Sequence, residues 1–189
     1  MQAVSDEQLI QWVAQGDASC LGTLYERHHK GLYNYALRLT NNAAHSEDLV
    51  QELFLRLMKK ASSFSNEASF KSWAFHILRN LTFDHLRQAK RQQTRTDADE
   101  VLAQELVDSR SAEQAAAGQQ DVQLLERSLA RLPLEQRDII WLGRFEFADY
   151  QSLASALGCT PATARVRMHR AMKALTAVFE LLNGVVSNV

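Results

Sequence analysis

Residues 149–175 carry helix start and stop signals at a spacing that admits two helices joined by a tight turn. Asp149 is a favourable N-cap for the segment YQSLASAL, and Gly158 is the residue type that most often follows a helix end. Thr160 and Pro161 then supply a second N-cap and a proline at the first helical position. Two helices separated by about three residues that include glycine form the helix-turn-helix pattern.

The second of these helices is expected to have one apolar stripe and one basic face, because side chains advance by about 100° per residue. The stripe comprises Ala164, Met168, Ala171, Met172 and Leu175. The face comprises Thr163, Arg165, Val166, Arg167, His169, Arg170 and Lys173. We interpret it as a recognition helix in which Val166 contacts a thymine methyl group and Arg165, His169 and Arg170 flank it. The alternative is a basic helix that is merely solvated.

The whole chain is expected to be all-α, since 7 glycines and 2 prolines in 189 residues argue against a strand-and-turn architecture. Between residues 92 and 119 the sequence becomes polar, acidic and rich in Ala and Gln, which is typical of a flexible linker. The prediction is therefore two small helical domains, 1–91 and 120–189, joined by a flexible acidic linker over 92–119.

A helix expected over residues 69–88 has a second unusual surface. Its buried stripe comprises Phe70, Trp73, Ala74, Ile77, Leu78 and Leu81. Its other side comprises Ser72, Phe75, His76, Arg79, Asn80, Phe83 and Arg87. Aromatic rings among cations suit stacking on unpaired bases while arginines hold the backbone. Packing of Phe75 and Phe83 on neighbouring helices is the alternative, and spacing does not decide between them.

Composition excludes several function classes. Cys20 and Cys159 lack partners at metal-ligand spacing and are expected to be unpaired thiols. The sequence contains no Gly-rich phosphate loop, zinc motif or nucleophile elbow, so we expect neither an enzyme nor a cofactor or metal. The N-terminus is polar and acidic, and no apolar run approaches the ~20 residues that span a bilayer, so a cytoplasmic protein without membrane insertion is expected.

Three segments in order resemble the extracytoplasmic-function (ECF) subgroup of sigma-70 class sigma factors. SEDLVQELFLRL is similar to region 2.2, FKSWAFHILRNLTFDHLR to regions 2.3 and 2.4, and LPLEQRDIIWL with YQSLASALGCTPATARVRMHRAMKAL to region 4. The resemblance implies a protein that binds core RNA polymerase, directs it to −35 and −10 promoter elements and assists melting, without covalent chemistry. It also implies an anti-sigma factor as a partner.

The resemblance assigns residues to three surfaces. The 2.2-like helix would dock on the β′ clamp helices through Asp48, Gln51, Glu52, Phe54 and Arg56, whereas spacing alone favours a simple helix-dipole explanation for its charges. The C-terminal domain would also meet the β flap. The −10 element, as single-stranded DNA, would be contacted by Phe64, Ser65, Asn66, Trp73, Phe75, His76, Arg79, Asn80, Phe83 and Arg87. The −35 duplex would be contacted by Thr160, Thr163, Arg165, Val166, Arg167, His169, Arg170 and Lys173.

The chain departs at three positions from the sequence pattern of the family that it resembles. Val166 stands where a small polar residue is common, Phe147 where Gly is frequent, and Gly143 where a helix former is usual. Two other functions are kept as alternatives: a helix-turn-helix regulator that binds an operator as a dimer without polymerase, and a helical adaptor that only holds protein partners.

Overall fold

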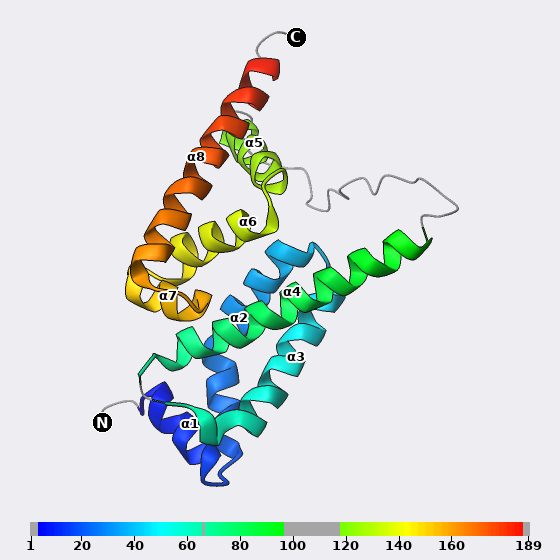
Figure 1. The fold of residues 1–189 in the computed structure, drawn as a ribbon. Coiled ribbons are helices and arrows are strands. Elements are labelled where there is room, and N and C mark those ends of the chain that lie inside the picture. Colours follow the sequence, from blue (N-terminus) through cyan, green and yellow to red (C-terminus); the bar gives the residue numbers. More distant parts are fainter. Residues whose placement is uncertain (1–3, 66, 97–117, 187–189) are drawn as a thin grey trace.

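A computed structural model describes residues 4–65, 67–96 and 118–186, and every regular element within these ranges is helical, as predicted. The helices form two bundles on either side of residues 97–117 (Figure 1). The N-terminal bundle comprises α1 (Asp6–Ala14), α2 (Ser19–Thr40), α3 (Ala43–Lys60), the 3-10 turn η1 (Ala61–Ser63) and α4 (Phe70–Thr96). The C-terminal bundle comprises α5 (Gly118–Ala130), α6 (Leu134–Trp141), the π-helical turn η2 (Leu142–Glu146), α7 (Tyr150–Leu157) and α8 (Pro161–Val186).

Local capping chemistry defines the turn between α7 and α8. The Asp149 carboxylate accepts a hydrogen bond from the Ser152 amide at 2.8 Å, which starts α7. Gly158 ends that helix with a φ of 65°, a left-handed conformation that glycine adopts without steric cost. The Thr160 hydroxyl accepts from the Thr163 amide at 3.2 Å and caps α8. The helix-turn-helix signals in the sequence are therefore confirmed.

Gly143 is explained by a close approach between η2 and α8. A Cβ atom at this position would lie 2.3 Å from Met168 Cε and 3.1 Å from a Leu153 methyl carbon. A side chain there would collide with the apolar stripe of α8, so the departure from a helix former lets the two elements pack closely.

The two bundles pack directly on each other. We call this contact the seam; α2 and α4 form one side, and α6, η2 and α7 form the other (Figure 1). Phe75 of α4 contacts Phe147, which follows η2, with ring centroids 5.4 Å apart. Buried residues of both bundles consequently form one continuous apolar cluster.

The helices of the structure extend past both predicted boundaries of the linker. Helix α4 continues through residues 92–96, which the sequence prediction had assigned to the linker. This stretch follows AKR and contains no glycine or proline, so nothing in it stops a helix. At the other end, α5 begins at Gly118 rather than after residue 119. The remainder of the predicted flexible linker, 97–117, lies outside the described residues.

Candidate nucleic-acid interface

Helix α8 presents the predicted basic face to solvent. Ala164, Met168, Ala171 and Leu175 are buried, and Met172 is half-buried, so the predicted apolar stripe is confirmed. The exposed residues on the opposite side are Arg165, Val166, Arg167, His169, Arg170 and Lys173. Val166 is 50% exposed although it is apolar, which leaves its side chain free to contact a ligand.

Arg165 is oriented by an aromatic neighbour on α7. Its guanidinium carbon lies 5.2 Å from the centre of the Tyr150 ring, within the range of a cation–π interaction. The sequence prediction did not include Tyr150. This contact holds the first arginine of α8 beside Val166 on the exposed face.

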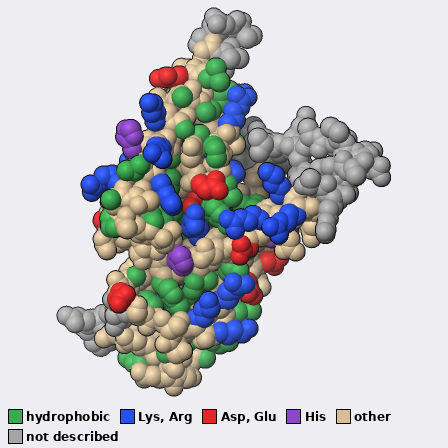
Figure 2. All heavy atoms as spheres, viewed as in Figure 1, with side chains coloured by type: hydrophobic (Ala, Val, Ile, Leu, Met, Phe, Trp, Pro, Cys, Tyr) green, Lys and Arg blue, Asp and Glu red, His purple; other side chains and the backbone are tan. Residues whose placement is uncertain are grey.

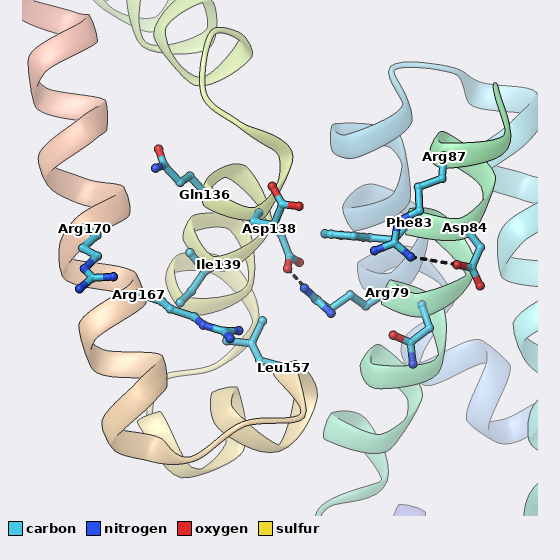
Figure 3. Close-up of a pocket in the computed structure, with 12 residues that line it drawn as sticks. Arg79, Phe83, Asp84, Arg87, Gln136, Asp138, Ile139, Leu157, Arg167 and Arg170 are labelled. Carbon is cyan, nitrogen blue, oxygen red and sulfur yellow. Dashed lines mark hydrogen bonds and ion pairs between the residues drawn. The ribbon is translucent and has the colours of Figure 1, made fainter. Parts of the chain in front are cut away.

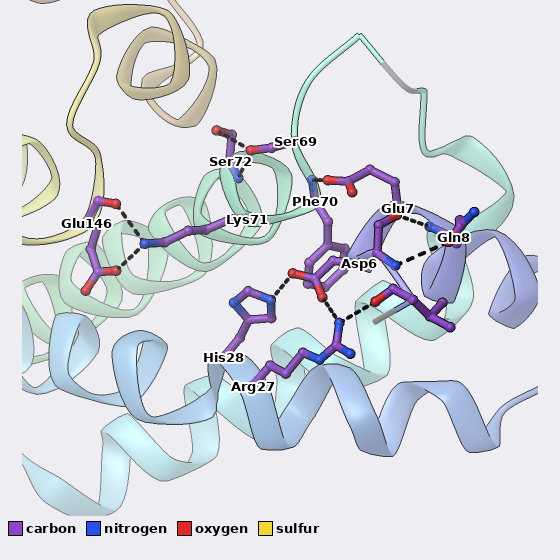
Figure 4. Close-up of polar contacts among 12 residues, drawn as sticks. Asp6, Glu7, Gln8, Arg27, His28, Ser69, Phe70, Lys71, Ser72 and Glu146 are labelled. Atoms are coloured by element: carbon purple, nitrogen blue, oxygen red, sulfur yellow. Dashed lines mark hydrogen bonds and ion pairs between the residues drawn. The ribbon is translucent and has the colours of Figure 1, made fainter. Parts of the chain in front are cut away.

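Helix α4 and the loop before it have a firmly anchored start. Glu7 of α1 accepts a hydrogen bond from the Phe70 amide at 3.0 Å, and the Ser69 hydroxyl accepts from the Ser72 amide at 3.1 Å (Figure 4). In the loop, Phe64 packs on Trp73 with ring centroids 5.2 Å apart. Ser65 is exposed, and the predicted site residue Asn66 lies outside the described residues.

The aromatic part of the predicted α4 surface is covered in this arrangement. Phe75 is 1% exposed and lies between Tyr35 and Phe147, and Phe83 is also buried. The prediction that both rings face outward needs correction here, because the C-terminal bundle packs over this side of α4. Packing on neighbouring helices, the alternative left open by spacing, describes both residues in this form. His76 and Arg79 are half-buried, whereas Asn80 and Arg87 remain exposed.

Arg79 takes part in a buried polar contact across the seam. Its Nε donates to an oxygen of Asp138 on α6 at 2.6 Å, and the Tyr35 hydroxyl donates to the other oxygen at 2.7 Å. The Arg79 guanidinium also lies 4.3 Å from the Phe83 ring centre. Burial raises the pKa of Asp138 above its ordinary value, while Arg79 and Tyr35 oppose that rise. Asp138 was not among the residues predicted from the sequence, where its signal was an acidic residue directly before the apolar pair Ile139 and Ile140.

Further polar contacts join the same two surfaces. Lys71 Nζ lies 3.0 Å from the Glu146 carboxylate and donates to the Glu146 carbonyl at 2.7 Å (Figure 4). His76 Nδ1 lies 3.2 Å from the carbonyl oxygen of Ala156. The predicted −10 face of α4 is thus used for contact with the other bundle over several turns.

The two predicted DNA-contacting surfaces meet at a cleft of about 490 Å³ between the bundles (Figure 3). Helix α4 contributes Arg79, Asn80, Phe83 and Arg87, and helix α8 contributes Arg167 and Arg170. Figure 2 shows Lys and Arg side chains on α8 and across the seam toward α4. Asp84, Glu135 and Asp138 line the same cleft, and Arg87 and Arg79 pair with Asp84 and Asp138. The arginines of α8 are therefore the part of the cleft that best suits a polyanion, since nucleic-acid affinity comes largely from phosphate neutralisation.

Helix α3 carries the residues predicted to meet the polymerase. Asp48, Gln51, Glu52 and Arg56 are exposed, and Arg56 pairs with Glu52 at 2.7 Å. Phe54 is corrected to a core residue, because it is 7% exposed and packs edge-on against Tyr25. The apolar residues that α3 presents outward are Leu55 and Met58, which sequence analysis missed. Their signal was two large apolar residues that lie outside the buried stripe of the helix.

Over the described ranges, the structure contains no group of three or more His, Cys, Asp or Glu side chains that could hold a metal ion. Both cysteines are free thiols. None of the helices in this part of the chain is long and apolar enough to cross a membrane.

Comparisons with known proteins point to one class of protein. Residues 24–92 match the family model for sigma-70 region 2, and residues 123–175 match that for sigma-70 region 4. The chain is 29% identical over 174 residues to the ECF RNA polymerase sigma factor SigL of Mycobacterium tuberculosis, covering 92% of this chain and 96% of SigL. It is 31% identical over 144 residues to EcfG of Rhodopseudomonas palustris, also an ECF RNA polymerase sigma factor, covering 76% of each chain.

A solved structure shares the arrangement of helices. It is the sigma factor RpoE of Bartonella quintana, in complex with the anti-sigma factor NepR. The TM-score is 0.66 at 25% identity, and the match covers 84% of this chain and 96% of RpoE. The similarity therefore extends across both bundles rather than stopping at the helix-turn-helix.

Proposed function

The chain belongs to the ECF RNA polymerase sigma factors, and from that membership we propose which of its surfaces carry promoter and polymerase binding. As a member of this class it binds core RNA polymerase and directs promoter recognition. We assign −10 recognition to the N-terminal bundle and −35 recognition to the C-terminal bundle. The match over both regions disfavours the alternatives of a dimeric operator-binding regulator and a helical adaptor.

The exposed face of α8 is the observation that carries this proposal. Exposed arginines, which take no part in the apolar core, surround the half-exposed Val166. The helix that carries them follows the tight turn after α7 and lies at the surface. Arginine pairs with guanine edges or phosphates, and an apolar side chain contacts the thymine methyl group. We therefore assign Thr160, Thr163, Arg165, Val166, Arg167, His169, Arg170 and Lys173 to the −35 element.

The −10 element is assigned to the α4 face and the loop before it. Trp73, Asn80 and Arg87 are reachable in the present arrangement, whereas Arg79, Phe75 and Phe83 are engaged at the seam. On this proposal, use of the whole face requires the bundles to part, because Asp138 and Phe147 contact Arg79 and Phe75, which we assign to DNA. The arrangement seen here is, on this proposal, a form that does not hold melted promoter DNA. Base capture and phosphate neutralisation then drive melting without covalent chemistry.

Polymerase docking is assigned to the outward face of α3. Asp48, Gln51 and Glu52 form its polar part, and Leu55 and Met58 supply apolar area of the kind found at the centre of stable interfaces. We further propose that a protein inhibitor binds this chain, since its structural relative RpoE was solved with the anti-sigma factor NepR.

Transcription with purified components tests the assignment. Core polymerase with this protein should start RNA at defined sites in a library of genomic fragments, and core polymerase alone should not. Arg165→Ala should reduce those starts while leaving association with core polymerase unchanged. Failure of the protein to associate with core polymerase, or starts that do not depend on it, would refute the assignment.

A further inference from the structure

The seam contains a carboxylate whose partners both come from the opposite bundle. Asp138 belongs to α6 of the C-terminal bundle, and it accepts from Tyr35 of α2 and Arg79 of α4 at 2.7 and 2.6 Å. It is 1% exposed. Among the hydrogen bonds and ion pairs of the described residues, its side chain has no partner within its own bundle. A buried carboxylate is unfavourable without partners, so this residue is matched to the closed arrangement rather than to the C-terminal bundle alone.

The contact with Asp138 occupies the guanidinium group of Arg79, which we assign to DNA binding. A carboxylate and a phosphate bind the guanidinium group of arginine through the same donors, so they compete for it. While Asp138 holds Arg79, the guanidinium group lies over the ring of Phe83 at 4.3 Å and helps to cover it. One ion pair therefore neutralises a cation and screens an aromatic ring on the predicted −10 face.

Other contacts also hold the two bundles together, but none of them provides a hydrogen bond to the Asp138 carboxylate. Phe75 packs on Phe147, and Lys71 pairs with Glu146, at the part of the seam nearest η2. Arg38 of α2 contacts both Glu126 at 3.2 Å and the Trp141 ring at 4.8 Å. These contacts are individually modest, so removal of the buried pair should shift the balance between closed and open forms.

We propose that the C-terminal bundle is an intramolecular inhibitor of the N-terminal bundle, in which Asp138 competes with promoter DNA for Arg79. The inference rests on the proposed role of α4 in −10 binding. On this inference, α6 has two roles: it packs against α8, and its Asp138 restrains Arg79 of the N-terminal bundle. Opening of the seam releases Arg79 and uncovers Phe75 and Phe83 in one step.

Asp138→Asn tests this inference in the full chain, because it removes the charge and retains the shape. Glu135→Gln is the matched control, since Glu135 lies one turn earlier on α6 and lines the same cleft without a direct pair to Arg79. Two quantities are measured: the radius of gyration by small-angle X-ray scattering, and affinity for a fluorescent single-stranded 20-mer of random sequence. Asp138→Asn should expand the molecule and raise affinity about tenfold, a change of 1.4 kcal/mol. Glu135→Gln should change neither quantity appreciably.

Further variants separate competition from simple loosening. Arg79→Gln should expand the molecule without the gain in affinity, because it removes the group for which DNA and Asp138 compete. Tyr35→Phe removes only one hydrogen bond to Asp138 and should shift both quantities in the same direction by less. This variant carries the test if circular dichroism shows that Asp138→Asn does not fold.

Two outcomes overturn the inference: unchanged size and affinity in a folded Asp138→Asn protein, or an equal gain in Glu135→Gln. Neither outcome affects the proposed function, which is tested separately by start-site choice with core polymerase. Conversely, loss of start-site choice in the wild-type protein refutes the function, even if Asp138→Asn opens the seam.

Discussion

Phe147 meets Phe75 edge to face across the seam, with ring centroids 5.4 Å apart and planes inclined at 77°. Lys71 Nζ lies 5.2 Å from the Phe147 ring centre. The aromatic pair contributes to the apolar part of the contact between the two bundles.

Phe147→Ala should lower the free energy of unfolding by about 3 kcal/mol, because it empties a buried aromatic site. Phe145→Ala, on the same turn, is the control. Phe145 is 66% exposed and stacks on Trp141, so its loss should cost no more than about 1.5 kcal/mol. Urea unfolding followed by circular dichroism gives both values, and equal losses would contradict a stabilising contribution from the buried Phe147 ring.

Gly143→Ala should destabilise the C-terminal bundle by about 1 kcal/mol, since the new Cβ lies 2.3 Å from the mobile end of Met168 and 3.1 Å from a Leu153 methyl carbon, and both side chains must shift. In a Met168→Leu background, which lacks that terminal methyl group, the same substitution should cost less. Gly22→Ala is the control, because nothing lies within 4 Å of its Cβ position in α2, and stability should rise slightly. Thermal unfolding of the five proteins tests the packing, and additive effects of the two substitutions would contradict it.

Val166→Ser should change the preferred base at one position of the −35 element and leave non-specific affinity nearly intact. The physical reason is that Val166 is half-exposed and is not part of the buried core, so the substitution removes only its contact with a base. Competition binding against a set of single-base variants measures the preference. Lys173→Ala is the contrasting variant: it should weaken binding to all sequences alike and reduce the salt slope by about one. Uniform weakening by Val166→Ser would contradict the thymine contact.

Leu55→Asp should weaken association with core polymerase at least about tenfold without changing the stability of the free protein. Leu55 is 49% exposed on α3, so its replacement disturbs no core packing, yet it places a charge at the centre of the assigned docking face. Fluorescence anisotropy of a labelled chain titrated with core polymerase measures the effect. Trp12→Ser, at an exposed apolar site on α1, should leave the affinity unaltered. Comparable losses in both variants would argue against α3 as the docking surface.

Tyr35 should make the closed form sensitive to alkaline pH. Burial and the neighbouring Asp138 raise the pKa of Tyr35 well above its ordinary value of 10.0. A group whose pKa is raised by the closed form stabilises that form fully below its ordinary pKa, and this contribution is lost as the pH rises through the raised value. Absorbance at the tyrosinate band should therefore show a component that titrates late.

Two substitutions identify that component. Tyr35→Phe should abolish it, and Asp138→Asn should move it to lower pH, because the carboxylate charge that opposes ionisation is gone. A late component that persists in Tyr35→Phe would assign it to another tyrosine and contradict the prediction.

Much of the fold was predictable because helix ends are set by local chemistry. Ser5 and Gln8 form a capping box at the start of α1, and Asp149, Gly158 and Thr160 act at the predicted ends of α7 and α8. Each of these interactions joins atoms within about four residues of one another, so a short stretch of sequence contains both partners. The exposed basic face of α8 follows in the same way from the periodicity of a single helix.

The part that only tertiary structure decided is which surface covers which. Periodicity identified a second face on α4 that mixes aromatic and basic residues. It could not predict that Arg79 would form an ion pair with Asp138, which lies 59 residues further along the chain. The same holds for Phe54, whose burial depends on Tyr25 of another helix. Helix ends are determined by the sequence because their hydrogen bonds are local. The covering of α4 is determined by the fold because it requires shape and charge to match between segments that the chain itself does not bring together.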